Sequence, residues 1–169
     1  ELATHNAVTR YALLDVKADA EKEIAARNLK FGAINHAMNM TDADLVEAAL
    51  VLGISDTTDL KVVRNEVSKY AEQNPKDFMS KVNDEDKALT ALIKKALDLG
   101  IVYRKEGVLR WKIGDLKIID LSADEDIVIP REFVRFAKVE QHGDLTVANL
   151  KKEIETSQKK TARAAKKAE

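Results

Sequence analysis

Cysteine is absent from the 169 residues of this chain. Its absence excludes disulfide bridges, thiolate zinc sites and cysteine nucleophiles, and it fits a reducing compartment or a particle interior. Long apolar runs are missing as well, because no window approaches the ~18 consecutive apolar residues of a membrane-spanning helix. No charged and then apolar secretory signal is seen at the start of the sequence. We therefore expect no membrane among its partners.

Catalytic and ligand-binding motifs are equally scarce. The sequence has no phosphate-binding glycine loop and no nucleophile elbow. Its three histidines, His5, His36 and His142, lie far apart along the chain. The acidic runs 84–86 and 124–126 do not match the spacing of an EF-hand calcium loop. We expect a protein that is not an enzyme and that uses no cofactor, no metal and no small-molecule substrate.

Helical periodicity dominates what is present. The clearest helix, 42–52, has Thr41 as its N-terminal cap and Gly53 as a left-handed stop. A second helix is capped by Thr58, and a third begins at the pair Asn74-Pro75, since proline favours the first helical position. The periodicity predicts helices over 6–30, 42–52, 59–73, 75–81, 84–99, 130–140 and from about 146 onward.

The first of these helices has an unusually narrow apolar side. Small and medium apolar residues recur every four positions, and Asn28 and Gly32 mark its expected end. A helix with so little apolar surface needs a partner, which is either the rest of the chain or another copy. The recurring residues are Val8, Ala12, Val16, Ala20 and Ile24.

Strands follow the helix that ends at Gly100. The segments 101–105 and 108–113 alternate around Glu106-Gly107, and 116–121 is a third candidate strand. A two-residue turn would pair Arg104 with Leu109 and Val102 with Trp111, whereas a three-residue turn would change that register. We expect Trp111 to be buried with Leu52, Phe78, Leu92 and Ile93, and Ile113 to share its inward face.

Three helices followed by a hairpin is the element order of a winged helix, and "ALDLGIVYRKEGVLRWKIG" carries that resemblance. The longer pattern "NPKDFM…ALIKKALDLGIVYRKEGVLRWKIGD" resembles modules in uncharacterised virion proteins of large tailed phages. The expected fold is mainly α with a small β-hairpin or three-stranded sheet. Its expected parts are an N-terminal helical arm (1–40), a winged-helix-like domain (41–121), a C-terminal helical extension (122–150) and a basic, helical or disordered tail (151–169).

The outer face of the hairpin is the first candidate contact surface. If the apolar side chains face inward, an aromatic ring and three cations face outward, which suits a phosphate backbone or a stacked base. The alternative is an ordinary solvated wing. The outward residues with binding chemistry are Tyr103, Lys105, Arg110 and Lys112.

The tail is the second candidate surface. Residues 151–169 carry a net charge of +4, while the whole chain is at −1, so residues 1–150 sum to −5. Such a tail grips nucleic acid or an acidic protein surface by charge, or it only keeps the protein in solution. Its basic residues are Lys151, Lys152, Lys159, Lys160, Arg163, Lys166 and Lys167.

Two functions are compatible with this pattern. The helix over 84–99 opens with "DEDK", and acidic side chains at that end repel a DNA backbone. The leading hypothesis is therefore a structural or assembly protein that binds other protein chains, in a virion or the cytoplasm. The alternative is a nucleic-acid-binding protein that uses the wing and the basic tail.

Overall fold

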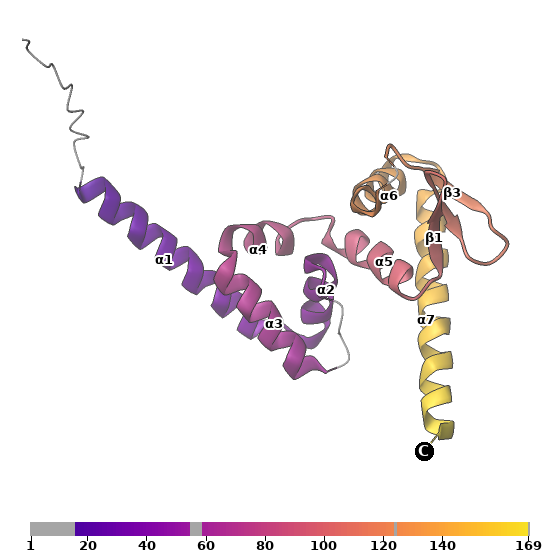
Figure 1. Ribbon diagram of the computed structural model, residues 1–169, viewed down its shortest axis with the longest axis horizontal. Helices are drawn as coiled ribbons and strands as arrows, with labels where there is room; N and C mark the ends of the chain where they lie inside the picture. The colour runs from indigo at the N-terminus through magenta and orange to yellow at the C-terminus, as the bar shows by residue number, and fades with distance from the viewer. Residues whose placement is uncertain (1–15, 55–58, 124, 169) are drawn as a thin grey trace, which may run out of the picture.

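The computed structural model describes residues 16–54, 59–123 and 125–168. The chain is mainly helical with a small antiparallel sheet between long terminal helices, which confirms the expected fold class (Figure 1). In chain order the elements are α1 (Val16–Asn39), α2 (Asp42–Leu52), α3 (Leu60–Gln73), α4 (Pro75–Val82), α5 (Lys87–Asp98), β1 (Val102–Lys105), β2 (Val108–Trp111), β3 (Lys117–Asp120), the short 3-10 helix η1 (Asp126–Val128), α6 (Ile129–Val139) and α7 (Gly143–Ala168).

Helix α1 does not end where the sequence predicted. It passes through Asn28 and Gly32 and continues to Asn39, while residues 6–15 of the predicted helix lie outside the described residues. The reason is tertiary packing, because Ala33 and Ala37 are fully buried against the neighbouring helices. Glycine inside a helix costs roughly 0.5–1 kcal/mol relative to alanine, which this burial offsets.

Local capping sets the limits of α2 as expected. The hydroxyl oxygen of Thr41 accepts a hydrogen bond from the backbone N–H of Asp44 at 3.2 Å. Gly53 adopts the left-handed conformation with φ of 82° and ends the helix. At α3 the prediction of a Thr58 cap was wrong, because the carboxylate of Asp59 accepts the hydrogen bond from the N–H of Lys61 at 2.9 Å.

The first core is entirely helical. It joins the C-terminal half of α1 to α2, α3 and α4, and Phe78 lies at its centre, fully buried. The ring of His36 from α1 meets the Phe78 ring edge-on, with 6.1 Å between centroids. Small alanines on α1, α2 and α3 allow these four helices to approach closely.

The second core combines helices with the sheet. Phe133 of α6, Leu150 of α7 and Ile93 of α5 are fully buried beside the sheet residue Leu109. Trp111 packs against this cluster and is partly buried. The expectation that Trp111 and Ile93 share a cluster with Phe78 was therefore wrong. Leu92 belongs with Trp111, whereas Leu52 packs with Phe78 in the first core.

A narrow joint connects the two halves. Leu50 and Val51 of α2 form a small separate cluster with Ala91 of α5. The ammonium of Lys94 on α5 also donates a hydrogen bond of 2.8 Å to the backbone oxygen of Val51. The helices that precede the sheet are thus divided between two cores.

The hairpin has the two-residue turn, which is one of the two alternatives that the sequence left open. Glu106 and Gly107 have φ of 53° and 70°, as a type I′ turn requires. Val102 pairs with Trp111 and Arg104 with Leu109, and β3 completes the order β1-β2-β3. Ile113, however, is 77% exposed beyond the end of β2, so its predicted inward position was wrong.

Two helix starts also differ from the prediction. Helix α5 begins at Lys87 rather than 84, because residues 84–86 form a turn in which Asp84 accepts a hydrogen bond from the N–H of Asp86 at 2.8 Å. Helix α7 begins at Gly143, which was expected to interrupt the chain before a helix near Thr146. A Cβ at Gly143 would lie 2.5 Å from the backbone oxygen of Ala137, so only glycine allows this close approach of α7 to α6.

Candidate partner-binding surfaces

The outer face of the hairpin is held together by Asp115, which the sequence analysis did not single out. The Tyr103 hydroxyl donates a hydrogen bond to the Asp115 carboxylate, and Arg110 donates one of 3.0 Å to the Asp115 backbone oxygen. The bond to Tyr103 lowers the pKa of Asp115 and raises the pKa of the tyrosine. The side chain of Arg110 is only 27% exposed. Its guanidinium is therefore engaged by Asp115 within the hairpin rather than directed at a partner.

Two of the predicted cations remain at the surface of the wing. Lys105 is exposed, and Lys112 is exposed with its ammonium 5.6 Å from the centroid of the Tyr103 ring, a cation–π contact. The ring is thereby partly covered on the side where a base would stack. Of the four predicted residues, Tyr103, Arg110 and Lys112 lie in one contact network, and Lys105 projects beside it.

One side chain of the acidic turn before α5, Asp86, meets α6, while Asp84 and Glu85 are exposed. The ammonium of Lys138 lies 2.5 Å from the Asp86 carboxylate, and this contact raises the pKa of Lys138. Lys87 lies 4.0 Å from Glu47 of α2. The turn before α5 thus takes part in holding α6 against the rest of the chain.

The basic tail forms the second part of a helix that is anchored by its first part. Leu150 and Ile154 of α7 are buried in the second core, and the backbone is helical to Ala168. Figure 1 shows the C-terminal end of α7 extending beyond the other elements. Exposed cations start at the core boundary with Lys151 and Lys152 and continue with Lys159 and Lys160. The side chains of Arg163, Lys166 and Lys167 lie outside the described residues.

The N-terminal half of α1 projects away from both cores (Figure 1). Every side chain from Asp19 to Asn28 is exposed, as is that of Phe31, and we call residues 17–31 the arm. Large apolar side chains continue along its outer side, where Ile24 is 57% exposed, Phe31 57% and Met38 54%. Their spacing of seven residues places them on one side of the helix, since two turns take 7.2 residues. The analysis of the sequence included Ile24 but missed Phe31 and Met38.

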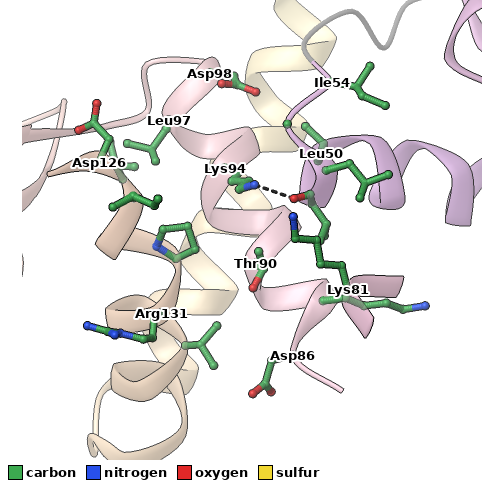
Figure 2. A pocket seen from close by; sticks show the side chains of 18 of the residues that line it. Leu50, Ile54, Lys81, Asp86, Thr90, Lys94, Leu97, Asp98, Asp126 and Arg131 are labelled. Carbon is green, nitrogen blue, oxygen red and sulfur yellow. Dashed lines mark hydrogen bonds between the residues drawn. The ribbon is translucent and has the colours of Figure 1, made fainter. Parts of the chain in front are cut away.

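A cleft of about 1220 Å³ lies between α2, α5, β1 and the start of α6. Figure 2 shows Lys94 reaching across it from α5 toward α2, where its hydrogen bond to Val51 neutralises the carbonyl end of that helix. Burial, and then the nearby charge of Lys81, lower the pKa of Lys94. Arg104 and Asp126 form a 2.8 Å ion pair at the rim. The hydrogen bond and the ion pair that line this cleft hold parts of the chain together, so we interpret the cleft as a joint between the two halves.

Glu132 is the buried charged residue of the second half. Its carboxylate accepts hydrogen bonds from Ser122 at 2.9 Å and from Arg131 at 3.3 Å, and Arg135 lies 2.9 Å away. The bond from Ser122, with help from the two arginines, lowers the pKa of Glu132. This cluster ties the segment after β3 to α6, and three satisfied contacts explain how the charge is tolerated inside.

Within residues 16–54, 59–123 and 125–168, no three acidic or histidine side chains are grouped as a metal would require. None of the helices in these ranges is long and apolar enough to span a bilayer. Comparisons with protein families, curated proteins and solved structures find no match.

Proposed function

We propose that this chain is a non-catalytic assembly protein that binds other protein chains through its protruding terminal helices. The supporting observation is the arm, whose outer side exposes Ile24 and Phe31 while its continuation buries the small residues Ala33 and Ala37. Burying the exposed half of each large side chain is worth about 1 kcal/mol. The resemblance to phage virion proteins makes a virus particle the first assembly in which to seek those chains.

The charge of the surface favours a protein partner over nucleic acid. Arg110 and Lys112 are engaged with Asp115 and Tyr103. In the acidic turn before α5, Asp86 pairs with Lys138 while Asp84 and Glu85 stay exposed, which disfavours a phosphate backbone there. The nucleic-acid alternative retains its support in Lys105 and in the exposed cations of α7. Such binding would be weak, tolerant of sequence and steeply dependent on salt.

Lysine cross-linking of the native assembly tests the proposal. Lys17 and Lys22 are exposed on the arm, and Lys159 and Lys160 are exposed on α7. We expect cross-links from these lysines to other protein chains, whereas Lys94, whose ammonium is bonded to Val51, serves as an internal control that stays unlinked. Efficient cross-linking of the body with none from arm or tail to another chain would contradict the proposal.

Titration of labelled duplex DNA separates the two functions. The assembly function predicts no measurable binding near physiological salt by the isolated chain. The nucleic-acid function predicts binding with a log–log salt slope of about −0.9 for each phosphate contact. A tail deletion in this assay must begin after Ser157, because Ile154 is part of the second core.

A further inference from the structure

The outer side of α1 has the spacing of a coiled-coil seam. The exposed residues Ile24, Phe31 and Met38 recur every seven positions. Intervening positions complete the alternating steps of four and three that two packed helices require. The full seam consists of Ala20, Ile24, Arg27, Phe31, Ile34 and Met38.

Charged residues in and beside the seam change sign from the tip to the base of the arm. Glu23 lies beside the seam near the tip, Arg27 occupies the seam one turn further along, and Lys30 lies beside the seam toward the body. Lys30 is paired with Glu72 at 3.0 Å, and Lys22 with Asp19 at 3.5 Å. Within the described part of the chain, Glu23 and Arg27 make no ion pair. The unpaired charges of Glu23 and Arg27 are therefore complementary to those of a second copy of the helix that runs the other way.

We propose that the arm docks against the arm of a second copy of this chain in an antiparallel pair. This inference rests on the proposed function and names its partner. Antiparallel alignment brings Glu23 of each copy to Arg27 of the other, and charges beside a seam set the orientation of paired helices. It also sets the small Ala20 of one copy against the large Phe31 of the other. A parallel pair in register would place Arg27 against Arg27, where like charges repel.

The body does not obstruct such a pair. The seam lies on a different side of α1 from Ala33 and Ala37, which are buried on the first core, and it meets α3 at its last residue, where Met38 contacts Ser68. Figure 1 shows the arm leading away from the other helices, so a second arm has access along its length. The rest of each molecule then lies at opposite ends of the paired arms.

A charge exchange in the full-length chain tests the orientation. Glu23→Lys and Arg27→Glu, each alone, convert both cross-copy contacts from attractive to repulsive, and each should weaken dimerisation about tenfold in sedimentation equilibrium. Mixing the two variants restores both attractive contacts, so the mixture should form a heterodimer within about threefold of the original affinity. A parallel pair does not bring these two positions together.

A second set of variants tests the seam itself. Phe31→Glu should weaken dimerisation by about a hundredfold, because it places charge where the apolar contact forms. Ile113→Glu is the matched control, since Ile113 is equally apolar and 77% exposed but lies beside the sheet, and its dimerisation should be unchanged. Circular dichroism of each variant at low concentration checks that the body is folded.

Three results would overturn the inference. They are a chain that stays monomeric to about 1 mM, a dimer that ignores Phe31→Glu, and variants that do not recombine on mixing. A monomer that still gives arm cross-links to a different protein in the native assembly would refute the inference and leave the proposed function standing.

Discussion

Replacing Phe78 with alanine should unfold one half of this protein before the other. Phe78 is fully buried at the centre of the first core, and the only tryptophan, Trp111, packs on the second core. Tryptophan fluorescence therefore reports on the second half alone, whereas far-UV circular dichroism reports on the helices of both halves. The two signals together show whether the cores unfold as one unit.

The size of the effect follows from burial. Removing a buried phenylalanine side chain costs about 3–5 kcal/mol. The small cluster at the joint between the halves buries Leu50, Val51 and Ala91, and the two larger side chains are worth roughly 1.5–3 kcal/mol each at most. Phe78→Ala thus removes from the first half about as much as the joint supplies.

Urea unfolding followed by both signals is the assay. With a slope near 2 kcal/mol per molar urea, the helix signal of Phe78→Ala should begin to fall about 2 M earlier than in the unmodified protein. The fluorescence midpoint should move less than half as far. Phe133→Ala, at the fully buried centre of the second core, is the matched control and should move the fluorescence transition directly. If Phe78→Ala moved both signals equally, the two cores would be one cooperative unit and our reasoning would be wrong.

Three further outcomes test individual contacts. Gly143→Ala should lower the free energy of unfolding by about 1–3 kcal/mol because its Cβ meets Ala137, whereas Gly32→Ala, with open space around it, should stabilise α1 by about 0.5–1 kcal/mol; equal melting temperatures would refute the close-approach argument. The lowered pKa of Glu132 gives stabilisation that is full above the unfolded pKa of about 4.3 and is lost as pH falls through the folded pKa, so Glu132→Gln should melt with a smaller difference between neutral and acid pH than the unmodified protein does. Lys94→Met should remove the hydrogen bond to Val51 and lower the free energy of unfolding by about 1–3 kcal/mol. If the circular dichroism and fluorescence transitions in urea stayed where they are in the unmodified protein, Lys94 would have no role in the joint.

Most elements were predictable because their limits depend on neighbouring residues. Thr41 and Gly53 set the ends of α2 through hydrogen bonds that span three or four positions. The hairpin was predictable as far as its turn at Glu106-Gly107, whose positive φ angles select one of the two registers that the sequence left open. The end of α1 was not predictable in this way. Its C-terminal half is helical because Ala33 and Ala37 pack against residues more than twenty positions away.

The candidate surfaces, too, were predictable only where they depend on composition or on neighbouring residues. The basic character of α7 is evident from composition, and the structure leaves Lys151, Lys152, Lys159 and Lys160 exposed. The cationic wing was only partly predictable, because its outward alternation holds but Asp115 engages two of its residues. Asp115 follows a turn after β2, and no short-range pattern shows that its carboxylate returns to Tyr103, twelve positions earlier.

The sequence by itself determined the helical or strand character of the main segments and the opposite charges of body and tail, and it limited the hairpin to two registers. These properties arise from backbone preferences, side-chain periodicity and composition, all of which act within a few residues. Only the tertiary structure decided that the helices are divided between two cores, that Lys94 joins them, and that the arm presents Phe31 to solvent. Each of those outcomes depends on which distant surfaces meet, as in the 43 positions that separate Lys94 from Val51. The hydrophobic effect that stabilises such contacts is non-directional. The apolar periodicity of a helix therefore shows which side must be covered, but it does not show which other segment covers it.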